Sequence, residues 1–208
     1  KTTIARIVLG LLEPSSGEVL YKGRTVADWL KKKRKEYLRE IQPIFQDPYS
    51  VYNPFYKVEH VLAMVIKKFN LASNKAEVKE KIVNAMKEIG LRPEDLLGRY
   101  PHQLSGGERQ RFMLTRILLI KPRLIIADEP VSMIDVSLKA LFLNHLISFK
   151  NKLGLSCLYI THDLNIASYI ADNMLVLCHG RVVEEAPKDT IIEEPLHPYT
   201  KLLMSSIA

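Results

Sequence analysis

The chain has 208 residues, of which 47% are hydrophobic and 25% are charged, and its formal net charge is +7. This composition is ordinary for a globular protein with one sizeable core, and the basic balance suits a phosphate-bearing ligand, nucleic acid or anionic lipid as a partner. No stretch approaches the roughly 20 apolar residues that cross a bilayer, and the first residues have no signal-peptide pattern. We therefore expect a globular protein that another protein would have to anchor if it acts at a membrane.

The first element expected along the chain is a helix with one buried face. Its apolar residues recur at the i, i+3, i+4, i+7 spacing that is typical of such a helix, and Pro14 would end it. A short strand follows around Val19–Tyr21 and stops at Gly23. The apolar positions of the helix are Ile4, Ile7, Val8 and Leu11.

A basic helical stretch over about 27–40 comes next. A run of like charges is most often a solvated helix face, and contact with a membrane surface or with a partner protein is the alternative interpretation. The cations of this stretch are Lys31, Lys32, Lys33, Arg34, Lys35 and Arg39.

The middle of the chain is predicted to be mostly helical. A short strand over 41–46 leads into a loop, and helical patterns then cover 57–70 and 75–90. No pattern of a buried strand interrupts the segment from 50 to 115. We therefore predict a helical subdomain over 50–115 within a single domain that covers 1–208.

The remaining part of the chain has the pattern of an α/β protein. Continuous apolar runs at 124–127 and 155–160 predict parallel strands that are buried on both faces, and residues 174–183 predict a hairpin. Cys157 and Cys178 lie within apolar runs and have no metal-ligand spacing. The predicted fold is α/β, with a parallel sheet and a mostly helical subdomain.

Lys1, Thr2 and Thr3 lie at the expected start of the first helix. In a phosphate-binding loop, glycine N–H groups cradle phosphates, a following Lys reaches the β- and γ-phosphates, and a Ser or Thr hydroxyl holds Mg²⁺. The glycines of such a loop would precede residue 1, so we expect the chain to be incomplete at its N-terminus. The Lys-Thr pair indicates a phosphate site only in combination with the motifs that follow.

Residues 104–110 read Leu-Ser-Gly-Gly-Glu-Arg-Gln and predict the start of a capped helix. Ser105 and Glu108 have the spacing of a capping box. Gly106 and Gly107 leave the N–H groups of the first turn bare, and a bare helix N-terminus favours an anion. Because glycine reduces helix stability, binding of an anion is one reason for this pair, and an ordinary capped helix is the alternative.

Polar side chains that suit phosphate chemistry follow three of the predicted strands. Open α/β sheets bind ligands at the carboxyl ends of their strands. There, Asp128 would hold Mg²⁺, Glu129 would orient and deprotonate an attacking water, and His162 would contact that water or the γ-phosphate. Gln46 would contact Mg²⁺ or water from the strand over 41–46. Each of these residues taken alone would be an ordinary polar residue at a strand end.

In this order, the motifs resemble those of the ABC ATPase family, and the resemblance covers nearly the whole chain. Residues 104–110 are similar to the ABC signature, which other phosphate-loop ATPases lack. The resemblance implies that Lys1 and Thr2, with Thr3 beside them, end Walker A and that 124–128 is Walker B. It further implies a Q-loop at Gln46, a catalytic glutamate at Glu129, a D-loop over Ser132–Asp135 and a switch histidine at His162.

In this family two such subunits pair head to tail, and each ATP lies between Walker A of one subunit and the signature of the other. The resemblance therefore implies ATP and Mg²⁺ as cofactors, and a second, identical or related ATPase subunit as a partner. Residues expected to serve a nucleotide held mainly by the partner are Ser105, Gly106 and Gly107, and Glu108 and Asp135 are further residues expected to bind the cofactor. Residues expected to hold Mg²⁺ are Thr2, Gln46 and Asp128.

Two segments resemble those of oligopeptide and dipeptide importers. One is Phe45-Gln46-Asp47-Pro48 followed by Asn53-Pro54, and the other is His197-Pro198-Tyr199-Thr200 in the C-terminal tail (185–208). Nickel importers of the same group are similar. The resemblance implies ATP-driven import, most simply of peptides, at the cytoplasmic face of the cell membrane. Transmembrane permease subunits and, indirectly, a solute-binding protein are the expected partners, and nucleic acid is not. Met133 and Ile134 depart from the Ala and Leu usual in the family's D-loop.

Two alternatives remain open from the sequence. One is a soluble ABC ATPase that acts on nucleic acid or ribosomes, which the basic charge permits. DNA-repair relatives have a long coiled coil between Gln46 and Ser105, whereas this segment has no sustained heptad, and ribosome-acting relatives have two ATPase domains. The other alternative is a catalytically silent half of an asymmetric pair, against which Glu129, His162 and the complete signature argue.

Overall fold

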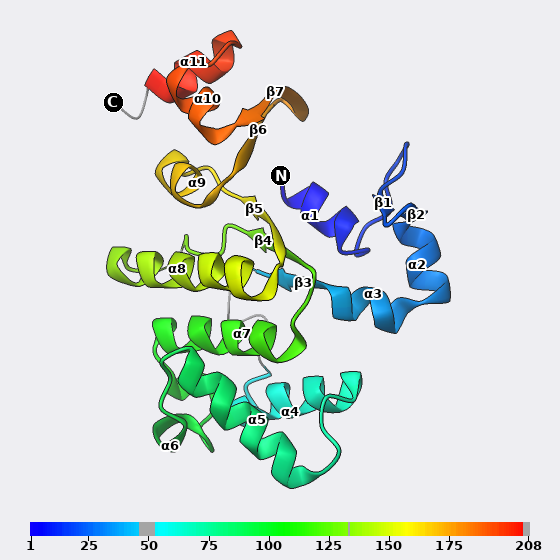
Figure 1. Ribbon diagram of the computed structural model, residues 1–208, viewed down its shortest axis with the longest axis vertical. Coiled ribbons are helices and arrows are strands. Elements are labelled where there is room, and N and C mark those ends of the chain that lie inside the picture. The colour runs from blue at the N-terminus through cyan, green and yellow to red at the C-terminus, as the bar shows by residue number, and fades with distance from the viewer. Residues whose placement is uncertain (46–52, 133, 206–208) are drawn as a thin grey trace.

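The computed structural model describes residues 1–45, 53–132 and 134–205. At its centre lies a three-stranded parallel sheet in the order β3–β4–β5 (Figure 1). Ala127 of β4 pairs with Ile44 of β3, and Asp128 pairs with Ile160 of β5. The carboxyl ends of the three strands therefore meet at one edge, as the sequence predicts. The strands are β3 (Ile41–Ile44), β4 (Leu124–Asp128) and β5 (Ser156–Ile160).

The two faces of the sheet are buried against different hydrophobic clusters. Successive side chains of a strand point to opposite faces, and β4 follows this rule with apolar residues on both. Ile125 and Ala127 belong to one cluster, and Ile126 belongs to the other. The continuous apolar run of β4 thus reflects burial on both sides, which confirms the prediction.

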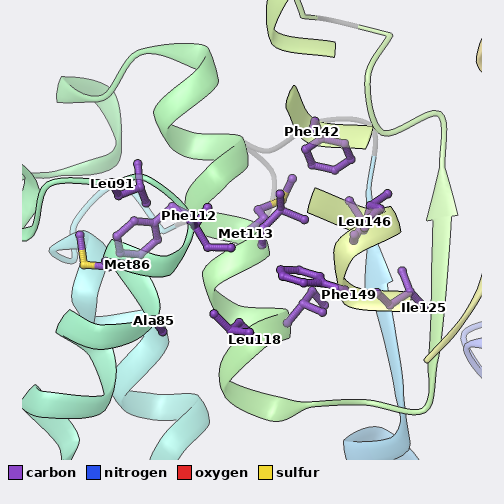
Figure 2. Packing of buried hydrophobic residues seen from close by; sticks show 14 of the residues in the cluster. Ala85, Met86, Leu91, Phe112, Met113, Leu118, Ile125, Phe142, Leu146 and Phe149 are labelled. Atoms are coloured by element: carbon purple, nitrogen blue, oxygen red, sulfur yellow. The ribbon is translucent and has the colours of Figure 1, made fainter. Parts of the chain in front are cut away.

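The first cluster joins the sheet to the helices of the middle of the chain. Helix α7 lies at its centre, where Phe112 and Met113 pack between Met86 of α5 on one side and Phe142 of α8 on the other (Figure 2). The predicted helices over 57–70 and 75–90 are confirmed as α4 and α5. The boundaries of the helical subdomain, 50 and 115, stay predictions, and α7 runs through residue 115. The elements are α4 (Val58–Phe69), α5 (Lys75–Glu88), α6 (Pro93–Leu96), η2 (Pro101–Gln103), α7 (Gly106–Ile120) and α8 (Val136–Leu153).

The second cluster covers the other face of the sheet with the N-terminal elements. Trp29 and Tyr37 are buried in it, and their rings lie 6.2 Å apart. The basic stretch forms two helices with a break at Lys33, and residues 31–36 are exposed, which fits a solvated face. The elements are α1 (Thr2–Val8), β1 (Leu20–Tyr21), β2 (Arg24–Thr25), α2 (Val26–Lys32) and α3 (Arg34–Glu40).

The buried face predicted for the first helix is wrong. Helix α1 ends at Val8, because Gly10 takes a left-handed φ of 68° and turns the chain before Leu11. Ala5 and Leu9 are the buried residues, whereas Ile4 and Leu11 are exposed. Ile7 and Val8 are half-buried.

The C-terminal part forms a third, smaller cluster around a β-hairpin. Met174 and Val176 of β6 pack with Ile191 of α10, and the predicted hairpin is confirmed. Strand β7 runs through residue 185, the predicted start of the tail. The elements are α9 (Leu164–Ile170), β6 (Asn173–Cys178), β7 (Arg181–Pro187), α10 (Lys188–Glu193) and α11 (Pro198–Ser205).

The motif at 197–200 forms the start of α11, and a carboxylate of β7 holds it. The two oxygens of Glu184 accept hydrogen bonds from the backbone N–H groups of Leu196 (2.8 Å) and His197 (3.1 Å). Nδ1 of His197 accepts one from the N–H of Tyr199 (3.1 Å). Among the described residues, none of the helices has both the length and the apolar character that spanning a membrane requires.

Candidate functional site

The chain turns sharply where β4 ends, and this turn presents Glu129. Glu129 has a left-handed φ of 48°, a conformation that is uncommon for a residue with a side chain. Its backbone N–H donates to the carbonyl of Ile160 at the end of β5 (2.9 Å), and its own carbonyl accepts from the hydroxyl of Ser132 (3.0 Å). The backbone around the carboxylate is therefore fixed on both sides.

Glu129 and His162 lie in direct contact at this edge. Nδ1 of His162 is 2.7 Å from Oε1 of Glu129, and the Thr161 hydroxyl is 3.5 Å from Oε2. The Glu129 side chain is 19% exposed and the His162 side chain 74% exposed. An ionised carboxylate only accepts hydrogen bonds, so a hydrogen bond here requires the tautomer with its proton on Nδ1, and Nε2 has no hydrogen-bond partner among the described residues.

The start of α1 reaches the same edge. Nζ of Lys1 donates to the backbone carbonyl of Thr161 (2.7 Å), which precedes His162. Thr2 and Thr3 are exposed in the first turn of α1. Residues from the beginning of the chain and from the ends of β4 and β5 therefore meet, as expected from the parallel strand order.

Asp128, the last residue of β4, has an oxygen without a partner. Its Oδ1 is buried and accepts no hydrogen bond from the part of the chain that the structure describes. A buried carboxylate oxygen without a donor is costly, unless a cation or a bound water satisfies it. The donor set therefore fits Mg²⁺, although no cluster of three His, Cys, Asp or Glu residues that could form a metal site occurs among the described residues.

The predicted capping box at the start of α7 is confirmed. Ser105 Oγ accepts from the N–H of Glu108 (3.3 Å), and Oε2 of Glu108 accepts from the N–H of Ser105 (2.7 Å). Burial alone would raise the pKa of Glu108, but the hydrogen bonds from Ser105 outweigh it and hold this pKa below its ordinary value. Glu108 is thus a stable part of the cap.

The two glycines of this turn differ in their surroundings. A Cβ at Gly107 would lie 2.7 Å from a methyl carbon of Leu138 in α8, so close helix packing accounts for this glycine. A Cβ at Gly106 would have open space, and the residue is exposed. Packing against the described residues therefore does not require Gly106, and its N–H group is left open at the start of α7.

The remaining expected site residues form no hydrogen bond with the Glu129–His162 pair among the described residues, or lie outside those residues. Asp135 is exposed at the N-cap of α8, and its side chain caps no N–H group of that helix. Among the described residues, Ser105, Gly106 and Gly107 form no hydrogen bond with Glu129 or His162. Gln46 and Met133 lie outside the described residues.

Gln110, the last residue of the predicted signature, was given no role of its own from the sequence. Its side chain is 3% exposed, and its Nε2 donates to the backbone carbonyl of Pro130 (2.8 Å), next to Glu129. A polar residue at a buried position of an apolar helix is the signal that would have identified it.

Comparisons with known proteins agree with this arrangement. Residues 1–132 match the family model described as ABC transporter, and residues 183–208 match that of the oligopeptide/dipeptide transporter C-terminal region. CbiO1 from Clostridium perfringens, described as part of the ABC transporter complex CbiONQ, has a similar solved structure. The TM-score is 0.77 at 25% identity, over 99% of this chain and 80% of that one. The predicted fold class is thereby confirmed.

The sequence relatives are ATP-binding proteins of peptide transporters. The oligopeptide transport ATP-binding protein OppF of Streptococcus pyogenes serotype M1 is 42% identical over the whole chain and 67% of its own length. OppF of Bacillus subtilis is 41% identical over the whole chain and 68% of its own length. The di/tripeptide transport ATP-binding protein DppF of Pseudomonas aeruginosa is 38% identical over 99% of the chain and 63% of its own length. These names do not favour the nucleic-acid or silent-subunit alternatives. The chain therefore belongs to the ABC transporter family.

Proposed function

We propose that this protein is the ATP-binding and ATP-hydrolysing subunit that powers import of oligopeptides or dipeptides across a membrane. The observation that carries the proposal is the contact of Glu129 with His162, beside the unpartnered oxygen of Asp128. These groups lie at the sheet edge where an α/β fold binds its ligand. The peptide specificity is supported by relatives with 38% to 42% identity.

The side chains of the site divide the work of phosphoryl transfer to water. Lys1 neutralises charge on the β- and γ-phosphates from the start of α1. The carboxylate of Glu129 accepts the proton of the attacking water, and His162 fixes that carboxylate through Nδ1 and contacts the γ-phosphate or the water through Nε2. Positioning and neutralisation of charge are the main contributions a protein makes to this reaction.

Mg²⁺ is the metal that the donors fit. Asp128 would hold it directly or through water, together with the hydroxyl of Thr2 and the amide of Gln46, because Mg²⁺ prefers oxygen ligands and keeps several waters. When bound, the ion neutralises phosphate charge during the transfer.

The signature residues serve the nucleotide of a second subunit. The bare N–H groups at Gly106 and Gly107, with the hydroxyl of Ser105, provide an anion site at the start of α7. Glu108 stabilises this turn through the capping box, and Asp135 faces the nucleotide across the pair. The partner is an identical or a related ATPase subunit, and ATP between the two subunits closes the pair.

The hydrolysing pair acts on transmembrane permease subunits, and it lies at the cytoplasmic face of the membrane as a peripheral component. Peptide reaches the permeases from a solute-binding protein, which this subunit does not touch. The Q-loop region around Gln46 passes the movement to the permeases.

Hydrolysis of ATP by the full-length protein tests the proposal. We expect Mg²⁺-dependent turnover by the wild type and a loss of about 10²-fold or more in Glu129→Gln, the range for removal of a general base. The variant should accumulate as an ATP-bound dimer in gel filtration. Glu185→Gln, an exposed change on β7, is the control and should hydrolyse ATP like the wild type. Equal rates for the wild type and Glu129→Gln, or no turnover in either, would refute the catalytic role.

Import itself is measured with the permease subunits in proteoliposomes. ATP inside the vesicles should drive uptake of labelled di- to pentapeptides when a solute-binding protein is supplied outside. ATP hydrolysis that peptide does not stimulate, with no peptide uptake, would contradict peptide import and leave the ATPase assignment intact.

A further inference from the structure

A buried side chain, that of Gln110, joins two parts of the proposed site. One part is the start of α7, where Gly106 offers bare N–H groups to an anion. The other is the turn after β4, which presents Glu129. These parts serve different nucleotides in the proposed pair, so a connection between them would let one nucleotide influence the catalytic carboxylate of the other.

The connection is the hydrogen bond from Gln110 to Pro130. Gln110 lies one helical turn after Gly106 and Gly107, and its Nε2 donates to the carbonyl of Pro130 over 2.8 Å. The Glu129 carbonyl is already occupied by the N–H (3.3 Å) and hydroxyl (3.0 Å) of Ser132. Among the described residues, the Pro130 carbonyl accepts a side-chain hydrogen bond from Gln110, and proline has no N–H with which to hold the turn. Gln110 is therefore the point at which α7 fixes the turn.

A second contact joins the first turn of α7 to helix α8, which follows the turn after β4. Gly107 approaches Leu138 of α8 so closely that a Cβ would lie 2.7 Å from a leucine methyl carbon. The first turns of α7 thus contact the chain on both sides of Asp135, at Pro130 and at Leu138. A displacement of the start of α7 has to displace the segment that carries Glu129 and Asp135 as well, because packed interiors do not deform freely.

A purely structural explanation of Gln110 is that it satisfies a buried carbonyl. That explanation also holds for Thr115, a buried polar residue of α7 whose hydroxyl donates to a carbonyl of the helix itself. Gln110 differs because its partner lies outside the helix, next to Glu129. Most other buried positions of α7 are apolar, as Figure 2 shows for Phe112, Met113 and Leu118. Burying an amide costs free energy unless a hydrogen bond compensates for it, so the bond to Pro130 is the feature that favours glutamine here.

We infer that Gln110 is a positioning residue that couples a phosphate bound at the start of α7 to the orientation of Glu129. This inference rests on the proposed function, because it assigns a regulator to the same hydrolytic site. In the pair, the γ-phosphate of the partner's nucleotide holds the start of α7, α7 holds Pro130 through Gln110, and the turn then holds the carboxylate toward the attacking water. Each subunit thereby senses that the opposite site is occupied.

The test replaces Gln110 with leucine, which keeps most of the side-chain volume and removes the donor. We expect kcat for ATP hydrolysis to fall by about tenfold, while KM for ATP changes by less than about twofold, because one buried hydrogen bond to the catalytic turn is lost and Walker A is untouched. The control is Thr115→Val on the same helix. Thr115 is fully buried and its hydroxyl bonds to the Arg111 carbonyl (3.0 Å), so this variant also loses a buried hydrogen bond but keeps the contact with Pro130.

Hydrogen exchange supplies a readout that does not depend on hydrolysis. A non-hydrolysable ATP analogue with Mg²⁺ should slow exchange of the peptide that covers Glu129–Ser132 in the wild type and in Thr115→Val. In Gln110→Leu this protection should be lost, although the analogue still binds. Protection of the turn in Gln110→Leu equal to that in the wild type would overturn the inference.

The kinetic results separate this inference from the proposed function. If the wild type hydrolyses ATP and Gln110→Leu has the same kcat, the positioning role is wrong and the ATPase stands. If kcat falls equally in Gln110→Leu and Thr115→Val, the loss reflects helix stability, and the positioning role is again wrong. If the wild type does not hydrolyse ATP, the proposed function fails, and the exchange experiment alone decides the coupling.

Discussion

Nδ1 of His162 lies 2.7 Å from Oε1 of Glu129, although 33 positions separate the two residues in the chain. The contact follows from the strand order. Because β4 and β5 are parallel neighbours and Asp128 pairs with Ile160, the residues that follow each strand emerge side by side. The first prediction concerns this pair.

Replacing His162 with alanine should lower kcat for ATP hydrolysis by about 10²-fold, because the carboxylate loses the group that orients it. Thermal stability should change little, since the imidazole is largely exposed. The control is His179→Asn, in the turn between β6 and β7. His179 has a left-handed φ of 48°, which asparagine tolerates. Equal loss of activity in both variants would contradict a specific role for His162.

The two glycines at the start of α7 should respond differently to the same change. Gly106→Ala should keep or raise the stability of the fold, because space is open there and alanine favours a helix by up to ~1 kcal/mol. Its ATP turnover should nevertheless fall by about tenfold, equivalent to ~1.4 kcal/mol of phosphate binding. Gly107→Ala should lose about 1 kcal/mol of stability, since the Leu138 side chain has to leave its rotamer. Urea unfolding and turnover measured on the two variants check this, and a stability loss in Gly106→Ala as large as that in Gly107→Ala would contradict it.

Removing the carboxylate of Asp128 should stabilise the metal-free protein while abolishing Mg²⁺-dependent hydrolysis. The Oδ1 atom is buried without a donor among the described residues, so Asp128→Ala should remove the free-energy cost of desolvating it. Each kcal/mol of stability gained in this way should raise Tm by about 2–4 °C. Asp163→Ala is the matched contrast, because Asp163 caps α9 through the N–H groups of Asn165 and Ile166. Its Tm should fall, by the equivalent of ~1 kcal/mol. A Tm that falls equally in both variants would show that Asp128 is satisfied in solution.

The C-terminal helix should loosen in acid because of Glu184. The nearby Thr200 hydroxyl, followed by the backbone N–H groups of Leu196 and His197, holds the pKa of Glu184 below its ordinary value of 4.5. A carboxyl with a lowered pKa in the folded state contributes stability that is present above pH 4.5 and is lost as the pH falls through the folded value. The protection factors of the amides in 196–205, which correct for the slower intrinsic exchange in acid, should therefore fall below pH 4.5. In Glu184→Gln the exchange should be fast already at neutral pH. Glu185→Gln serves as the control, because neighbouring residues of a strand point to opposite faces, and an effect equal to that of Glu184→Gln would contradict the role of the carboxylate.

The spacing of apolar residues correctly predicted the helices and strands in which buried positions follow a regular pattern. The runs at 124–127 and 155–160 became β4 and β5. Burial on both faces is confirmed for β4, whereas β5 lies at the edge of the sheet with Ser156 exposed and 157–159 half-buried. The capping box at Ser105 was predicted for a local reason, since both of its hydrogen bonds lie within four residues.

The errors and omissions came from contacts between distant segments. Helix α1 stops before Leu11 because Gly10 takes a left-handed φ, and Gly10 lies so close to the distant Leu30 that a Cβ would not fit there. The sequence did not reveal the hydrogen bond of Gln110, because its partner, Pro130, lies 20 positions away. The contact of Lys1 with Thr161 spans 160 positions. The spacing of residues along a sequence does not show which distant segments lie in contact. That information comes from the three-dimensional arrangement of the strands and helices.

The alternation along β4 has a consequence for how this sequence can change over time. Ile126 shares a cluster with Trp29 and Tyr37, whereas Ile125 shares one with α7 and α8. Accepted changes of size at Ile126 should therefore be accompanied by changes in the N-terminal elements, and those at Ile125 by changes in the two long helices. Two adjacent positions of one strand thus belong to separate groups of co-evolving residues.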